Sequence, residues 1–486
     1  MKLTKTIPLV IITSLLAFYA CKKKEKSTTK EEIKEEVLAT YNKVIDTSLC
    51  ESSWFPHSQT PAPEEGKGSP FDVSSTTNGI FHQWSWQKFL WLTKPDGEAN
   101  LPLFLNSTEA YQVDSHLGKI APISGASVVL EDTAQAGSSG ILRTNPAYNP
   151  ENNQEETVFY SIHVSPTLFD AAQKFKDSII GGTLAKNNLS SFPVGSLELK
   201  VSWVTVDAIP ENKRVNYFTT TGAINDGNGN FTNTEVALLG MHVVGVVENH
   251  PEFIWATFEH DDLAPNYNWK EDKATSDTDK LLFAKGTTTG IKGIYWDTIT
   301  KQALELYKNY DLFKYGVPLD NKGDFMKTCQ QEPINFDNIK NINACVKENL
   351  DKEEGPWKHY FYNGSIWVDT DGLTTEEQAK LLVNAGSKLD KATSGSPARG
   401  SLNNANVTME TYTQTFKSEL SDINVNNLAN CFSCHNAVSY TGDTSPIYLS
   451  HIFDAFIKGA EGKTKSEVEK LKAKQEVEDF MRKKLN

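Results

Sequence analysis

Cysteine and histidine are scarce in this sequence, and their spacing disfavours the common structural zinc sites. The chain has 6 Cys and 10 His among 486 residues. Cys431 and Cys434 form one close pair, and neither a second pair of cysteines nor a pair of closely spaced histidines follows it. A structural zinc ion needs four ligands at such spacings. The close pair therefore requires another explanation.

Long apolar runs and an excess of basic charge are also missing. Past residue 20, no apolar run approaches the length of about 18 residues that a membrane-spanning helix needs. Lys and Arg number 48 against 62 Asp and Glu, which gives a formal net charge of −14. Such an acidic chain disfavours nucleic acid as a partner and favours neutral or basic proteins.

The N-terminus, residues 1–20, has the pattern of a secretory leader. Lys2 and Lys5 flank the start of an apolar run of 14 residues, Ile7–Ala20, which is short for a bilayer span. The run ends at Cys21 in a sequence that resembles a loose bacterial lipobox, so we expect a lipid on Cys21. The protein is then exported and anchored by this lipid alone to a bacterial membrane, on its periplasmic or cell-surface face. An ordinary cleaved leader beside an unrelated Cys21 is the alternative.

Cys431-Phe432-Ser433-Cys434-His435 has the C-x-x-C-H spacing that attaches a c-type haem. Two thiols at this spacing lie on one side of a helical turn, where they can form thioethers to both vinyl groups of one porphyrin. The histidine that follows can ligate the iron. A dithiol redox pair has the same spacing, but it usually follows a strand in a thioredoxin-like βαβ pattern. We expect one covalent haem c on Cys431 and Cys434, with His435 as the proximal iron ligand.

The second axial ligand stays open. A His or Met in this position suits electron transfer, whereas an open position allows chemistry with peroxide, oxygen or nitric oxide. The candidate distal ligands are His451, His242, Met409 and His260. Each has an ordinary alternative, a histidine satisfied by a hydrogen bond or a methionine that fills space in the core. The absence of any protein ligand is the remaining alternative.

Three cysteines remain once lipid and haem are assigned, Cys50, Cys329 and Cys345. An oxidising compartment allows one disulfide among them. Cys329 and Cys345 are the closest in sequence, so we expect this pair to be bonded and Cys50 to be unpaired.

Apolar periodicity predicts an α+β fold, with a β-rich central core, helices at both ends and a C-terminal helical haem-binding segment. Residues 81–92 are apolar on nearly every side of a helix and are expected in the core. Further helices are expected at 167–175, with Ser165 as N-cap, at 338–349, and at 375–389, with Thr374 and Glu377 as a capping box. Strands are expected at 197–204, 217–223, 236–247, 253–260 and 365–368.

These elements divide the chain into five segments. They are the leader 1–20, a lipid tether with a helix and loops 21–78, an α+β main domain 79–391, a Gly and Ser-rich linker 392–405, and a haem-binding segment 406–486.

With these segments assembled, the chain resembles a family of exported bacterial lipoproteins, similar to monohaem c-type cytochromes, that carry one C-x-x-C-H motif near the C-terminus. The resemblance lies in Trp86–Leu90, Leu197–Trp203, Gly240–Val244, Trp255–His260 with Pro265 beyond it, and Thr408–Thr411. It implies haem binding and export, and it implies no settled activity.

Several functions are compatible with these observations. The first is electron transfer, in which the large N-terminal part docks a redox partner protein. The second is a haem enzyme or gas sensor, whose distal pocket is built around His242, His260 or the helix at 84–91. The third is a binding module with a structural haem. We expect electron transfer, because a lone C-x-x-C-H haem most often serves it and no assembled catalytic set is recognisable.

Overall fold

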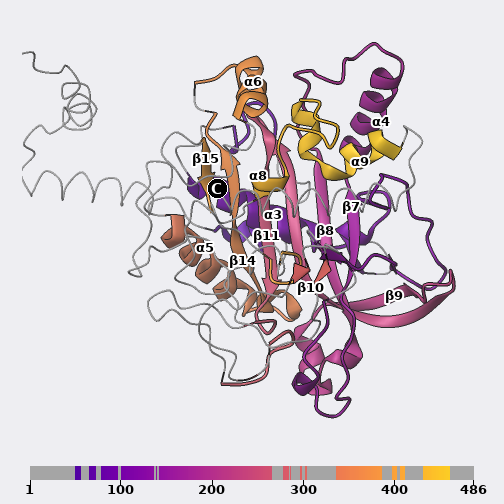
Figure 1. Ribbon diagram of the computed structural model, residues 1–486. Coiled ribbons are helices and arrows are strands. Elements are labelled where there is room, and N and C mark those ends of the chain that lie inside the picture. The colour runs from indigo at the N-terminus through magenta and orange to yellow at the C-terminus, as the bar shows by residue number, and fades with distance from the viewer. Residues whose placement is uncertain are drawn as a thin grey trace, which may run out of the picture. The chain divides into compact units, whose positions relative to one another are not determined.

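A sheet of nine strands forms the centre of the computed structural model (Figure 1). The structure describes residues 50–55, 65–72, 78–96, 100–135, 138–139, 142–264, 277–283, 285, 296–297, 302–303, 335–370, 372–385, 397–401, 406–410 and 431–459. The strand order is β15 (Ala398–Gly400), β14 (Tyr360–Val368), β11 (His250–His260), β10 (Phe231–Val247), β8 (Leu197–Thr205), β7 (Phe159–Val164) and β3 (Tyr111–Val113), with β9 (Thr219–Asn225) on β10 and β4 (Val128–Leu130) on β9. Neighbouring strands are antiparallel except β4 and β9, which are parallel.

Six α-helices and three short two-stranded ladders accompany this sheet in the described part of the chain. The helices are α3 (Asn78–Leu92), α4 (Pro166–Ile180), α5 (Asn335–Leu350), α6 (Thr375–Ala385), α8 (Cys431–Cys434) and α9 (His451–Gly459). The short ladders pair β1 (Pro95–Asp96) with β2 (Leu101–Pro102), β5 (Ala134–Gln135) with β6 (Ser138–Ser139), and β12 (Trp296–Asp297) with β13 (Gln302–Ala303). The expected mixture of helices with a large, mainly antiparallel sheet is therefore confirmed.

The hairpin of β10 and β11 lies in the middle of the sheet. The two strands have 17 and 11 residues, and their apolar side chains are buried on both faces, as their nearly continuous hydrophobic sequence predicts. Side chains alternate between the faces. Met241 and Val243 point to one side, called the first face, and Val244 points to the other, the second face.

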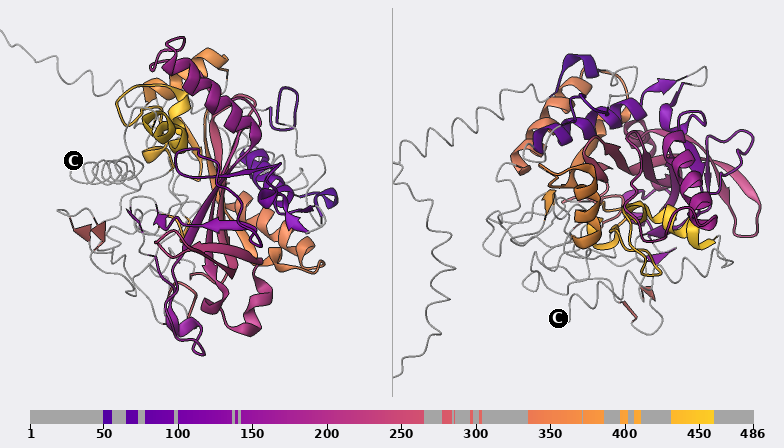
Figure 2. Two further views of the ribbon diagram at one scale, coloured as in Figure 1. Left: turned by 90° about the vertical axis from the view of Figure 1, so that its right-hand side faces the viewer. Right: turned by 90° about the horizontal axis from the view of Figure 1, so that it is seen from above.

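The first face is covered by α3 and α5 (Figure 2). Phe81, Trp84, Trp86 and Phe89 of α3 are buried against the sheet, which confirms the expectation that this aromatic helix lies in the core. Burying one such side chain contributes about 1.5–3 kcal/mol to folding. The helix thus acts as the main apolar anchor of this layer.

The second face carries two apolar clusters at opposite ends. One cluster joins Trp255 of β11 to α4, α6 and α9 and to Phe432 of α8. The other contains Tyr160, Leu239 and Met409. Because α3 lies on the first face, it does not contact the C-x-x-C-H segment, and the sheet separates the two (Figure 2).

The caps of α4 and α6 are those predicted from the sequence. The Ser165 hydroxyl accepts a hydrogen bond from the Leu168 backbone N–H at the start of α4. At the start of α6, the Thr374 N–H donates to the Glu377 carboxylate at 2.9 Å and the Glu377 N–H donates to the Thr374 hydroxyl at 3.4 Å. This is the expected capping box.

The disulfide differs from the prediction. Cys345 is bonded to Cys50 and not to Cys329, and the Cα atoms of Cys50 and Cys345 are 6.1 Å apart. Proximity in sequence was the wrong guide here, because Cys50 packs against the apolar cluster that contains α5, on which Cys345 lies. Cys329 lies outside the described residues, as do the leader and Cys21.

The described residues from Cys50 onward belong to one compact unit, Cys50–Asn486. β15 forms inside the stretch 392–405 that composition suggested as a linker, and it adds an edge strand to β14. Within the described ranges, no helix is both long and apolar enough to cross a bilayer.

Candidate functional site

The C-x-x-C-H sequence begins with the short helix α8, which places Cys431 and His435 one helical turn apart. The His435 backbone N–H donates to the Cys431 carbonyl at 2.8 Å and so continues the turn. Residues four apart on a helix share a face. Cys431 is not in a disulfide. Burial, with a smaller contribution from the negative charge of Glu410, raises the pKa of the Cys431 thiol above its ordinary value.

The imidazole of His435 is fixed through one of its nitrogens. Its Nδ1 lies 2.9 Å from the Leu449 carbonyl oxygen. A carbonyl can only accept, so Nδ1 carries a proton. A histidine that ligates a metal through Nε2 commonly donates Nδ1–H to such a backbone carbonyl. The donor set of Cys431 and His435 therefore fits a c-type haem.

Two aromatic rings lie against this imidazole. The ring of His451 stacks on it, with centroids 3.7 Å apart and an interplanar angle of 21°. The indole of Trp255 lies 4.2 Å away, at 43°. Nε2 would hold the iron of a c-type haem through a lone pair in the plane of the His435 ring, whereas His451 lies over the face of that ring. His451 lies over the ring face, where it packs against the proximal imidazole.

Polar contacts join the segment around His435 to the rest of the fold. The Ser450 hydroxyl donates to the carboxylate of Glu198 on β8 at 2.8 Å. The backbone N–H of Thr444 donates to the Asn187 side chain at 2.8 Å. These bonds, together with the apolar cluster around Trp255, fix the segment on the second face of the sheet.

A band of polar residues crosses the second face between its two apolar clusters. It is made of Lys200, His242 and Thr257, which are neighbours across β8, β10 and β11, and of Asn406, Thr408 and Glu410, which lie on them. We call this set the polar belt. His242 Nε2 lies 2.8 Å from Glu410 Oε1, with both side chains about one-fifth exposed, at 18% and 20%.

Asn406 attaches the 406–410 turn to the sheet. Its side-chain amide donates to the Thr257 hydroxyl and to the Phe258 carbonyl, each at 3.0 Å. Its side-chain oxygen accepts from the Thr408 N–H at 2.9 Å. Its backbone N–H donates to Glu410 Oε2 at 2.8 Å, which leaves Oε1 for His242.

The other two candidate ligands lie elsewhere. Met409 is fully buried in the apolar cluster at the far end of the second face. His260 stacks on Tyr217 with centroids 3.6 Å apart, its Nε2 lies 3.0 Å from the Asn216 carbonyl, and its Nδ1 accepts from the Asp262 N–H at 3.1 Å. Burial lowers the pKa of His260 to about 3, so it stays neutral. Both nitrogens of His260 are thus already engaged.

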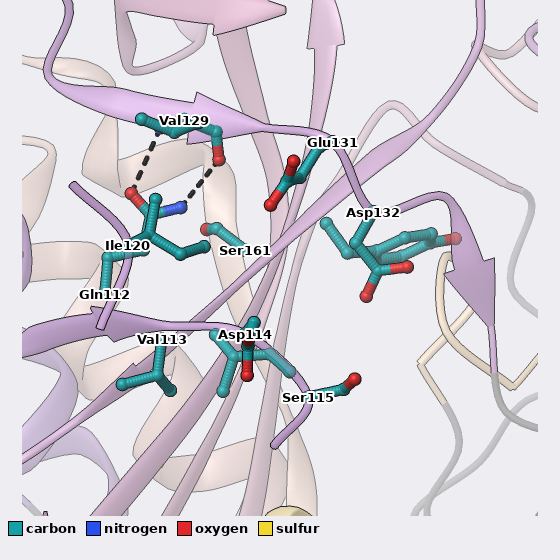
Figure 3. Close-up of a pocket in the computed structure, with 11 residues that line it drawn as sticks. Gln112, Val113, Asp114, Ser115, Ile120, Val129, Glu131, Asp132 and Ser161 are labelled. Carbon is teal, nitrogen blue, oxygen red and sulfur yellow. Dashed lines mark hydrogen bonds between the residues drawn. The ribbon is translucent and has the colours of Figure 1, made fainter. Parts of the chain in front are cut away.

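A small cavity lies near the sheet edge between β3, β4 and β7 (Figure 3). It holds about 20 Å³, which is room for about one water molecule. Its lining includes the carboxylates of Asp114, Glu131 and Asp132. The side-chain amide of Gln112 donates to the Val129 carbonyl and accepts from the Val129 N–H. This volume is too small for an organic substrate.

The structure brings together residues that the sequence did not connect. His435 meets His451 and Trp255, and His242 meets Glu410, whereas His260 and Met409 belong to the other end of the sheet. Sequence reasoning missed Glu410 and Trp255 as residues of the site. In the part of the chain that the structure describes, no group of three or more His, Cys, Asp or Glu side chains is placed to hold a metal ion.

Searches of protein-family models, of curated proteins and of solved structures found no match to this chain.

Proposed function

We propose that this chain is an exported c-type haem protein that transfers electrons. One haem is attached to Cys431 and Cys434, and His435 is its proximal ligand. The observation that carries the proposal is the C-x-x-C-H spacing, together with the hydrogen bond from His435 Nδ1 to the Leu449 carbonyl, which is the bond that a histidine ligating a metal through Nε2 commonly makes.

Bound haem supplies one-electron exchange between ferric and ferrous iron. The protein supplies a fixed ligand and an apolar surrounding. The Leu449 carbonyl sets the tautomer of His435, and the rings of His451 and Trp255 restrict its rotation. Phe432 and Leu449, both fully buried, supply apolar surface in the same segment. A ligand held in one orientation keeps the reorganisation energy of electron transfer small.

The proposed setting is the outer side of a bacterial membrane, with the lipid on Cys21 as the anchor. The leader and the lipobox-like sequence support this location. The formal charge of −14 favours a neutral or basic redox partner protein. Because the field of an acidic surface steers association, docking to a basic partner should weaken as salt increases.

A haem enzyme or gas sensor is the second candidate. It is favoured by the place of His451, which stacks on the face of His435 and so does not occupy the position opposite it. Under this alternative no protein side chain besides His435 would bind the haem iron, and the polar belt lies on the same face of the sheet as the C-x-x-C-H segment.

Haem attachment is tested on protein matured with the haem-attachment machinery. Mass spectrometry should show one added haem, which acid acetone does not remove, and the double variant Cys431→Ser with Cys434→Ser should lack it. A pyridine haemochrome at the position of b-type haem would refute covalent attachment. Spectra of the ferrous protein with carbon monoxide then separate the candidates: a low-spin spectrum that carbon monoxide leaves unchanged supports electron transfer, and rapid binding supports an open site.

Anchoring is tested by the variant Cys21→Ser. It should move the protein from the membrane to the soluble fraction, because the lipid is the proposed attachment. Retention of this variant in the membrane would contradict the proposal.

A further inference from the structure

His242 and Glu410 have the geometry of an oriented base. A carboxylate oxygen accepts, so the 2.8 Å contact assigns the proton of His242 to Nε2 and the lone pair to Nδ1. Among the described residues, Nδ1 of His242 has no hydrogen-bond partner. Glu410 is itself held through Oε2 by the Asn406 N–H. A histidine whose one nitrogen is fixed by a carboxylate, with the other nitrogen open, is the usual arrangement of a general base.

The pair lies beside the C-x-x-C-H segment. His242 pairs with Thr257 across β10 and β11, and Trp255, two residues from Thr257 on the same face, contacts His435. Such diagonal neighbours on an antiparallel ladder are about 7–8 Å apart. Glu410 also contributes to the electrostatic environment of the Cys431 thiol. With about one-fifth of each side chain exposed, the pair is open to small molecules from solvent.

We propose that His242, oriented by Glu410, is the proton acceptor for small weak acids, H–X, that bind as the anion X⁻ to ferric haem. Hydrogen cyanide and hydrogen sulfide are members of this class. The H–X bond breaks, its proton goes to Nδ1 of His242, and the electron pair left on X⁻ forms the bond to iron. No electron is transferred. The carboxylate of Glu410 stabilises the imidazolium that results. This inference rests on the covalent haem of the proposed function and on the open sixth position of the second candidate function, the haem enzyme or gas sensor.

The test compares two ligands that differ in whether they carry a proton. Cyanide, the probe, is added to the ferric full-length holoprotein, and association is followed by stopped-flow absorbance. Carbon monoxide is added to the ferrous protein as the second ligand, because it brings no proton. Three variants are measured: His242→Gln, Glu410→Gln and, as a matched control, His359→Gln. His359 is partly exposed and lies beside His260, away from the belt.

We expect His242→Gln to slow cyanide association by about 100-fold, the lower end of the usual range for a general base. Glu410→Gln should slow it less, because the amide still fills the site but stabilises the imidazolium poorly. Carbon monoxide association should change less than about twofold in every variant, and His359→Gln should match the wild type in both assays. Soret spectra and unfolding curves show that each variant is folded and loaded.

Three results overturn the inference, and they are distinguishable. Equal cyanide rates in wild type and His242→Gln remove the role of His242. A parallel loss of carbon monoxide binding in that variant shows general disruption of the site. A wild-type haem that binds neither ligand has a closed iron, which overturns the inference and leaves electron transfer standing. Absence of covalent haem from the matured protein refutes the proposed function itself.

Discussion

The imidazole of His451 stacks on the imidazole of His435, 16 residues earlier in the sequence, with ring centroids 3.7 Å apart. The loop between them returns the chain so that the Leu449 carbonyl reaches Nδ1 of His435 and the next helix begins at His451. His451, a candidate distal ligand in the sequence analysis, therefore lies against the face of the His435 ring.

Replacement of His451 by phenylalanine should keep the covalent haem and the spin state of the wild type, because phenylalanine can still stack on His435. His451→Ala should be less stable than His451→Phe by more than about 0.5–1.5 kcal/mol, because an aromatic pair contributes this amount beyond the apolar burial that alanine also loses. Absorbance spectra report the spin state, and denaturant unfolding reports the stability. A change from low-spin to high-spin iron in His451→Phe would instead identify His451 as the second ligand.

The disulfide should stabilise the fold through the long loop that it closes. Cys50 and Cys345 are 295 residues apart, so Cys50→Ser and Cys345→Ser should each lower the free energy of unfolding by about 2–5 kcal/mol. The two effects should not add, because either variant breaks the same bond. Cys329→Ser is the matched control and should change little. Non-reducing peptide mapping checks the pairing directly, and a peptide joining Cys329 to Cys345 would contradict the structure.

Much of the sheet could be predicted from local patterns. A few neighbouring residues are enough to predict that β10, β11 and α3 are buried. β10 and β11 are continuous apolar runs, and α3 is apolar on nearly every side. β15 could not be found in this way, since three residues, Ala-Arg-Gly, show no periodicity. Its existence depends on the partner strand β14.

The candidate site was predictable only in part. C-x-x-C-H is a local motif, so the sequence is enough to propose it. The contact between His242 and Glu410 joins residues 168 apart, and it depends on the register of β10 and on the anchoring of Asn406. Likewise, Cys50 reaches Cys345 only because α5 packs on the first face. Contacts set by strand register and helix packing leave no local signal.

Asn406→Asp should destabilise the polar belt strongly. The side-chain amide of Asn406 donates to the Thr257 hydroxyl and the Phe258 carbonyl, and it is fully buried. An aspartate there would point an oxygen at the Phe258 carbonyl and bury a charge, so we expect a loss of about 2–5 kcal/mol in the free energy of unfolding. Urea unfolding measures this loss. Asn349→Asp, at a partly buried position on α5, is the comparison, and an equal loss in both variants would contradict a special role for Asn406.

Three buried histidines should make the fold sensitive to mild acid. Burial lowers the pKa of His82 from 6.5 to about 4 and the pKa values of His163 and His260 to about 3. Below pH 6.5 the unfolded chain binds a proton at each histidine, whereas the folded chain does not. Stability from these groups is therefore complete above that pH and is lost as the pH falls. Each group adds up to about 1.4 kcal/mol per pH unit to this slope.

His82→Gln isolates one of these contributions. Glutamine can donate to the Asn335 side-chain oxygen and lie beside the Tyr362 hydroxyl, the two partners of His82 at 2.9 and 2.6 Å. Urea unfolding between pH 6.5 and 4 should then show a slope smaller by about 1.4 kcal/mol per pH unit than the wild-type slope, because one proton fewer is taken up on unfolding. An unchanged slope would mean that His82 is protonated in the folded state, despite its complete burial between α3, β14 and α5.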